Sequence, residues 1–172
     1  MYTLDDLVRD LRAAGGPGSM AAMKEAIARA VSHQPLAADP NRSQVLYDEP
    51  GLMILHTAVD GGFDSPPHDH RTWAVIGVYE GQEDNTFYRL VDGTRAIEHA
   101  GGRSLNHGDV LTLGPEAIHK IANPRNDKLL ALHVYGVNIL KNERSAWDLA
   151  AMREYPFEVK IDRTGGFDNR QR

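Results

Sequence analysis

Residues 66–73 read PPHDHRTW, which places two of the eight histidines of a 172-residue chain one residue apart. The two prolines disfavour helix and favour an extended backbone at this point. Side chains at positions i and i+2 of an extended segment point to the same side, so His68 and His70 should face one common space. Two imidazoles that face the same interior space form half of a metal site, and the other half has to come from elsewhere in the chain.

The composition is that of one ordinary globular domain, with 41% hydrophobic and 25% charged residues. Nineteen Lys and Arg against 24 Asp and Glu give a net charge of −5, and no basic run offers a nucleic-acid surface. No apolar run approaches the ~20 residues of a membrane span, and the opening MYTLDDLVRD lacks the pattern of a signal peptide. The absence of cysteine excludes disulfides and zinc–thiolate sites. We expect a cytoplasmic protein that binds neither nucleic acid nor membrane.

The first 43 residues predict a pair of helices. The segment TLDDLVRDLRAA, residues 3–14, begins with a capping box formed by Thr3 and Asp6. The segment SMAAMKEAIARAVSH, residues 19–33, carries apolar side chains at helical spacing. We expect residues 1–43 to pack against the sheet that follows or against a partner subunit.

From residue 44 the pattern changes to short strands separated by Gly, Asp, Asn or Pro turns. The expected strands are residues 44–50, 51–59, 72–81, 85–91, 93–100, 109–115, 119–124 and 128–140. Short strands at this spacing are typical of an all-β sandwich or barrel. The barrel should span residues 44–140. Residues 141–172 form a C-terminal extension in which SAWDLAAMREY, residues 145–155, is a candidate helix.

Two glycine-framed motifs carry histidines in the barrel region. The first runs from Gly62 to Gly81 around the pair at positions 68 and 70, and the second is GDVLTLGPEAIHKIAN, residues 108–123, with His119 near its end. Together they resemble the two motifs of the cupin superfamily, whose small double-stranded β-helix, a jelly-roll barrel, holds a metal. The resemblance covers roughly residues 44–140 and implies an all-β cupin fold preceded by the helical pair.

The resemblance further implies that His68, His70 and His119 are the metal ligands. The glutamate that cupins usually add would fall at Ala74 or Val75, and neither side chain can bind a metal. Three neutral imidazoles suit iron, zinc, copper or nickel, so the ligand type alone does not select the ion. A site that keeps the full charge of a divalent cation favours substrates that arrive as anions.

Among cupins, a three-histidine site without the glutamate is similar to the thiol dioxygenases, cysteine dioxygenase and 3-mercaptopropionate dioxygenase. Their second signature is a strand carrying Ser-x-His-x-Tyr, and here residues 131–135 read ALHVY. The resemblance implies that His133 and Tyr135 act beside the metal. Because Ala131 stands where the family has serine, we expect water or a backbone carbonyl to pair with His133.

Arg144, nine residues beyond Tyr135, stands where bacterial mercaptopropionate-type enzymes place the arginine that binds the substrate carboxylate. A guanidinium suits that role because it binds a carboxylate through two parallel hydrogen bonds. A surface salt bridge would explain Arg144 equally well, and Arg71 and Arg89 are competing candidates.

The resemblance implies an enzyme, a non-haem Fe(II) dioxygenase. It would add both atoms of dioxygen to the sulfur of a small thiol carboxylate, 3-mercaptopropionate or cysteine in type, and produce a sulfinate. Other divalent metals, such as zinc, nickel or manganese, could also occupy the site. Two alternatives stay open: a metal-dependent cupin that acts on a non-thiol small acid, and a metal- or ligand-binding cupin without turnover. The chain could be a monomer or a homodimer.

Overall fold

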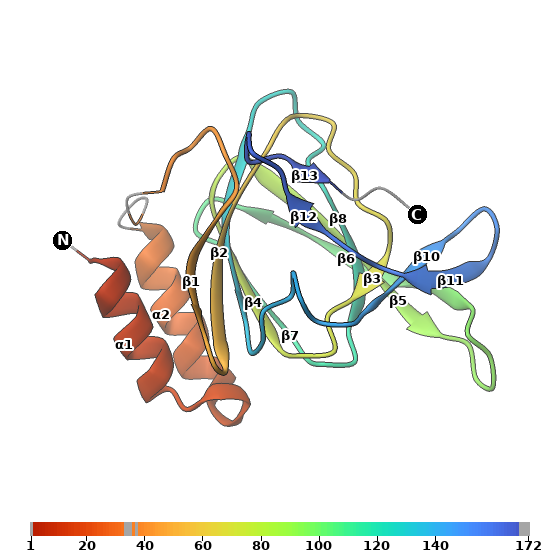
Figure 1. Cartoon of the computed structure of the whole chain (residues 1–172), viewed down its shortest axis with the longest axis horizontal. Helices are drawn as coiled ribbons and strands as arrows, with labels where there is room; N and C mark the ends of the chain where they lie inside the picture. The colour runs from red at the N-terminus through yellow and green to blue at the C-terminus, as the bar shows by residue number, and fades with distance from the viewer. Residues whose placement is uncertain (1, 33–35, 37, 169–172) are drawn as a thin grey trace.

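The computed structural model describes residues 2–32, 36 and 38–168, and it begins with two helices that lie side by side (Figure 1). Helix α1 (Leu4–Ala13) and helix α2 (Met20–Ser32) are joined by a short 3-10 turn, η1 (Gly16–Ser19). The predicted capping box is present: the Thr3 hydroxyl accepts the backbone N–H of Asp6, whose carboxylate accepts the backbone N–H of Thr3. Both predicted helices are therefore confirmed, and residue 33 lies outside the described residues.

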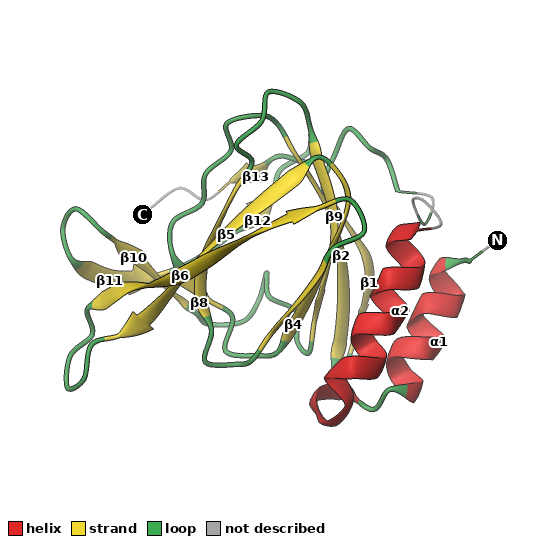
Figure 2. Cartoon of the chain, turned by 180° about the vertical axis from the view of Figure 1, so that it is seen from behind, coloured by secondary structure: helices red, strands yellow, loops and turns green. Residues whose placement is uncertain are grey.

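The strands form two antiparallel sheets that face each other, as Figures 1 and 2 show. The first sheet has the order β1 (Gln44–Glu49), β2 (Leu52–Val59), β9 (Leu129–Tyr135), β4 (Ala74–Glu80) and β7 (Val110–Leu113). The second has the order β11 (Arg153–Pro156), β10 (Ser145–Asp148), β3 (His68–Asp69), β8 (Ile118–Ala122), β5 (Gln82–Leu90) and β6 (Ile97–Asn106). A small third pair joins β12 (Lys160–Ile161) to β13 (Phe167–Asp168). This is the jelly-roll arrangement with an N-terminal helical pair that the sequence predicts.

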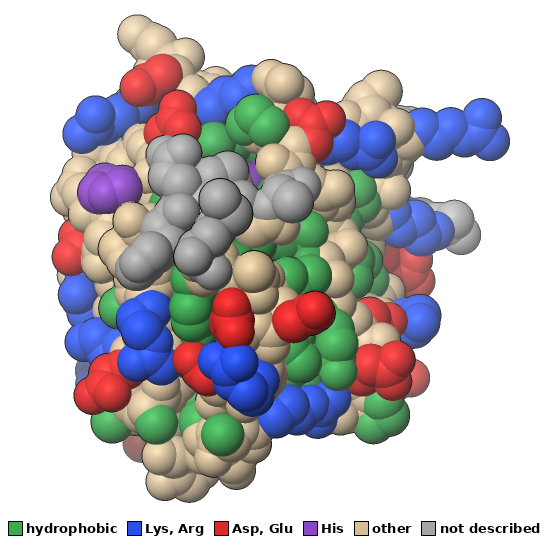
Figure 3. Space-filling view, turned by 90° about the vertical axis from the view of Figure 1, so that its left-hand side faces the viewer, with side chains coloured by type: hydrophobic (Ala, Val, Ile, Leu, Met, Phe, Trp, Pro, Cys, Tyr) green, Lys and Arg blue, Asp and Glu red, His purple; other side chains and the backbone are tan. Residues whose placement is uncertain are grey.

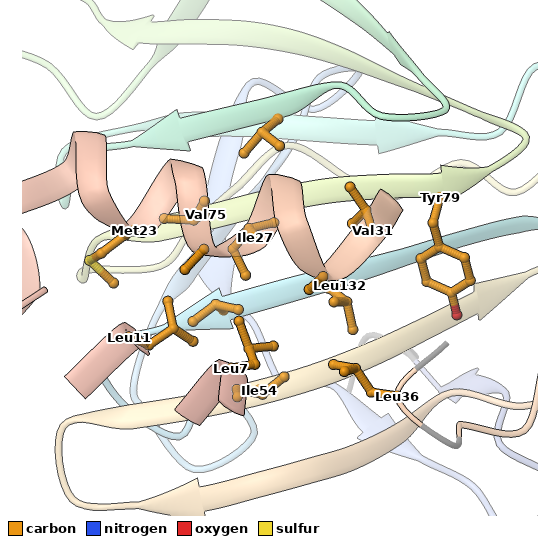
Figure 4. Close-up of a cluster of buried hydrophobic side chains, with 14 of the residues drawn as sticks. Leu7, Leu11, Met23, Ile27, Val31, Leu36, Ile54, Val75, Tyr79 and Leu132 are labelled. Carbon is orange, nitrogen blue, oxygen red and sulfur yellow. The ribbon is translucent and has the colours of Figure 1, made fainter. Parts of the chain in front are cut away.

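The first sheet is covered on both faces, which explains its continuous apolar strands. Every residue of β2 is buried. Leu52 and Ile54 belong to the core under the helices (Figure 4), whereas Met53 and Leu55 belong to the core between the sheets. Helix α2 packs so closely on β4 that a Cβ at Gly77 would lie 2.4 Å from Ile27 Cγ2. Any larger residue there would push the helix away from the sheet.

The face that carries the helices mixes charges of both signs (Figure 3). Asp10 of α1 pairs with Arg9 on the same helix and with Arg29 on α2, so the helices are linked by charge as well as by apolar packing. Among the described residues, no helix is long and apolar enough to span a membrane.

The predicted helix over residues 145–155 is wrong, because this segment is the β10–β11 hairpin. Ala146 pairs with His68 of β3, and the backbone N–H of Trp147 donates to the Pro67 carbonyl at 2.9 Å. These partners extend the second sheet, and tertiary pairing of this kind outweighs the modest helix propensity of the segment. The hairpin therefore holds the strand that carries the first histidine.

Candidate metal centre

The structure brings the three predicted ligands together inside the barrel. His68 on β3 lies directly opposite His119 on β8, and opposed residues of an antiparallel pair share one face of the sheet. His70 follows β3 by one residue. All three side chains are buried, and one nitrogen from each lies within 4.8 Å of the other two. Such a cluster could hold a metal ion.

Hydrogen bonds at Nδ1 leave the Nε2 atoms of His68 and His119 free to bind a metal. The Nδ1–H of His68 donates to the Pro66 carbonyl at 2.9 Å, and the Nδ1–H of His119 donates to Asn85 Oδ1 at 2.8 Å. Because each ring carries its proton on Nδ1, the lone pair that can bind a metal is on Nε2. The Nε2 atoms of His70 and His119 lie 3.4 Å apart. Two nitrogens with bonds of about 2.0–2.1 Å to one tetrahedral ion would have about this separation.

The electrostatics of the pocket keep these imidazoles neutral. Burial, with a smaller contribution from the nearby Arg144 charge, lowers the pKa of His68 from 6.5 to about 3. Burial also holds the pKa values of His70 and His119 well below the usual range. Metal binding needs unprotonated imidazole, so the donor set fits a divalent transition metal.

No carboxylate completes the cluster among the described residues. Ala74 lies in the core between the sheets, and Val75 lies in the core under the helices, so the positions of the usual cupin glutamate are both apolar. The chain thus presents a site built of three histidines on this side of the barrel.

His133 and Tyr135 lie on the inner face of β9, and the His133 Nδ1 is 3.1 Å from the Tyr135 hydroxyl. The Tyr135 ring packs edge-on against His70, with ring centroids 5.0 Å apart. Burial raises the pKa of the Tyr135 phenol, so the hydroxyl keeps its proton. The alternation of a β-strand accounts for this placement, because residues two apart on β9 point to the same face.

The expectation of water or a backbone carbonyl as the partner of His133 is wrong. His133 Nε2 pairs with the Glu83 carboxylate at 2.9 Å, and Glu83 on β5 has no solvent exposure. Sequence reasoning missed this residue because the polar run around it is equally typical of a solvated hairpin. The sequence spacing could have predicted its burial: Glu83 lies two residues before Asn85, and on a strand both side chains then point to the same, inner face.

Arg144 is 4% exposed, and its guanidinium carbon lies 4.7 Å from the centre of the Phe157 ring. Burial lowers its pKa, and no carboxylate of the described part of the chain forms an ion pair with it. The two competing arginines are engaged elsewhere: Arg71 pairs with Asp69, and the exposed Arg89 pairs with Glu98. Arg144 alone among the three lines the cavity at the histidines.

That cavity has a volume of about 60 Å³. Its polar lining comes from the three clustered histidines, His133, Tyr135, Arg144, Thr57 and Ser65, and apolar side chains such as Leu55, Ile121 and Phe157 fill the rest. Because one water needs about 10–15 Å³ of such volume, the space suits a molecule of only a few heavy atoms. A wider cleft of about 690 Å³ adjoins it and shares Arg144 and Phe157.

No family model matches the chain. Among solved structures, a cupin of the RmlC-like type with a double-stranded β-helix fold from Methanocaldococcus jannaschii is 16% identical over 62% of this chain and 88% of its own, with a TM-score of 0.47. A cupin 2 conserved barrel domain protein from Salinispora arenicola is 22% identical over 69% and 90%, with a TM-score of 0.43. An oxalate oxidase in complex with glycolate is 16% identical over 58% and 53%, with a TM-score of 0.45, so the chain spans about half of that protein. The structural neighbours are cupins, and likenesses at this level carry no argument about activity.

Proposed function

We propose that this protein is a non-haem iron dioxygenase that converts a small thiol carboxylate to its sulfinate. The observation that carries the proposal is Arg144, a buried guanidinium without an anionic partner among the described residues, beside three neutral imidazoles. Buried charges are normally paired, so an unpaired guanidinium in a cavity favours an anionic ligand. An iron(II) ion held by His68, His70 and His119 would supply the redox chemistry that joins dioxygen to sulfur.

The other side chains of the cavity would bind the substrate and form hydrogen bonds to the reacting atoms. Arg144 would bind the substrate carboxylate through two hydrogen bonds and direct the thiolate toward the histidines. The Tyr135 hydroxyl, protonated and 3.1 Å from His133 Nδ1, would turn its one proton from that nitrogen to the reacting oxygen or sulfur atoms once the substrate is bound. The overall change, thiol plus dioxygen to sulfinic acid, balances without an added reductant.

The direct test is oxygen uptake by the iron-loaded protein across a panel of thiols, thiol-free acids and amines, together with mass analysis of the product. The proposal expects uptake with thiol acids and an equal amount of sulfinate. Uptake with a thiol-free acid alone would support a cupin that acts on other small acids. Metal binding without uptake for any compound would support a cupin that binds without turnover.

The cavity should favour 3-mercaptopropionate over cysteine. None of its described lining residues is an aspartate or glutamate, and Glu83 is already paired with His133 behind the lining. The ammonium group of cysteine would lose water without gaining an anionic partner, which costs several kcal/mol. We expect kcat/KM for 3-mercaptopropionate to exceed that for cysteine by about 100-fold or more, measured by oxygen uptake. Equal values for the two thiols would contradict this assignment of the cavity.

Tyr135→Phe should slow turnover by about 10- to 1000-fold while the metal stays bound, because it removes one catalytic hydrogen-bond donor. The comparison requires kcat and metal content for both proteins under iron saturation. Tyr47→Phe is a suitable control, since Tyr47 lies on β1 and lines neither the small cavity nor the adjoining cleft. If Tyr135→Phe retained full activity, the phenol would have no part in the chemistry.

A further inference from the structure

Glu83 occupies an unusual place for a carboxylate, at the centre of a buried network on β5. Its side chain has no solvent exposure, and its two oxygens serve different partners. Oε1 accepts a hydrogen bond from the Asn85 amide at 2.9 Å, and Oε2 accepts one from His133 Nε2 at 2.9 Å. Burial raises the pKa of this carboxyl, but His133 and Asn85 outweigh that effect and lower the pKa overall. Glu83 therefore stays an anion that can only accept hydrogen bonds.

The first branch of the network ends at a candidate metal ligand. Because Glu83 accepts only, it draws the NH₂ group of Asn85 toward itself and turns the amide oxygen toward His119. That oxygen lies 2.8 Å from His119 Nδ1, so the proton of the neutral ring is held on Nδ1. The free Nε2 then faces His70 Nε2 at 3.4 Å, inside the histidine cluster.

The second branch ends at the tyrosine. His133 donates from Nε2 to Glu83, which leaves Nδ1 to face the Tyr135 hydroxyl at 3.1 Å. The hydroxyl can donate to that nitrogen when the ring is neutral, and the ring is held in one orientation by bonds at both nitrogens. Ala131, at the position of the family serine, lies in the apolar core between the sheets and offers no such bond.

We propose that Glu83 is a positioning residue that fixes the tautomers of both His119 and His133, and through them the metal site and Tyr135. This inference rests on the three-histidine site of the proposed function, but not on the identity of the substrate. The competing explanation is that Glu83 is a buried ion-pair partner that affects folding stability only. Removing one partner of such a pair is destabilising in either case, so stability alone does not separate the two.

The tautomers can be read directly from the wild-type protein. Ring ¹⁵N shifts and couplings in metal-free protein labelled at histidine, recorded near pH 7, should show His119 protonated at Nδ1 and unprotonated at Nε2. His133 should carry a proton at Nε2. A wild-type His119 protonated at Nε2, or a His133 without a proton at Nε2, would overturn the proposal without any variant.

Zinc affinity then tests the role of the charge. The Glu83 carboxylate accepts from two donors, the Asn85 amide and His133 Nε2. Glu83→Gln leaves one oxygen that can accept and adds an NH₂ group that can only donate, so the Asn85 amide loses its fixed orientation. We expect the zinc dissociation constant to rise about 10-fold, the lower end of the range for a lost outer partner of a metal ligand, with one zinc still bound per chain at saturation. Glu80→Gln, an exposed neighbour at the end of β4, is the matched control and should leave the constant unchanged.

A double variant moves the carboxylate by two residues and should restore the site. In Glu83→Gln with Asn85→Asp, the carboxylate at position 85 can accept hydrogen bonds from His119 Nδ1 and from the NH₂ group at position 83. The amide oxygen at position 83 can still accept from His133 Nε2. We expect zinc affinity within about threefold of wild type. A Glu83→Gln protein that is less stable but binds zinc as tightly as wild type would overturn the positioning role. Failure of wild-type zinc binding would instead count against the metal site itself.

Discussion

Replacement of His68, His70 or His119 by alanine, one at a time, is expected to reduce bound metal from about one ion per chain to nearly none. Each ring contributes one of three neutral donors, and two imidazoles without a carboxylate hold a divalent ion only weakly. Thiol-dependent oxygen uptake should fall to background in the same proteins. Metal content by elemental analysis, after loading with iron(II) under anaerobic conditions, provides the measurement.

Each truncation removes buried ring contacts and leaves a small cavity, so the free energy of unfolding should fall, but the two sheets keep their other contacts and the folded state should survive. Circular dichroism and thermal unfolding of the metal-free variants check this point. Glu80→Gln and His99→Ala, both at exposed positions, are controls that should keep full occupancy. A folded His70→Ala protein that still binds a full equivalent of iron would contradict the three-histidine assignment.

Arg144→Ala is expected to raise KM for 3-mercaptopropionate by roughly 30-fold or more. Loss of one partner of a buried, hydrogen-bonded charge pair costs roughly 2–5 kcal/mol. The cleft that adjoins Arg144 admits water, which places the expected loss at the lower end of this range. Arg144→Lys keeps the charge without the bidentate geometry and should show an intermediate KM.

The matched substrate control is cysteamine, a thiol without a carboxylate, for which Arg144→Ala should change KM little if it is turned over. The matched protein control is Arg89→Ala, because Arg89 is exposed and already paired with Glu98. Equal losses for the two thiols in Arg144→Ala would mean that this arginine supports the fold rather than the substrate. The carboxylate contact would then have to be sought at Arg71.

Much of this architecture follows from local sequence patterns. The spacing of His68 and His70 behind two prolines predicts that both rings share one side, and the alternation of residues 131–135 predicts an inward His133 and Tyr135. The capping box at Thr3 marks the start of the first helix. These features depend on backbone periodicity and on short-range hydrogen bonds, which a sequence displays directly.

The features that the sequence did not reveal all depend on contacts between distant segments. Residues 145–155 carry helix-compatible side chains, but they form a hairpin because β10 pairs with the backbone of β3, which lies far away in the sequence. Glu83 lies 50 positions before its partner His133, so its burial follows from the pairing of β5 with β8 and from the facing sheet. Polar residues on a strand do not by themselves show which face is covered.

The most direct test of the central claim is the fate of dioxygen labelled with ¹⁸O when the iron-loaded protein oxidises 3-mercaptopropionate. If the protein is a thiol dioxygenase, mass spectrometry will show a sulfinate that carries two labelled oxygen atoms, formed in an amount equal to the dioxygen consumed. Formation of disulfide with no labelled sulfinate, or of a sulfinate with one labelled atom and one from water, would contradict the account.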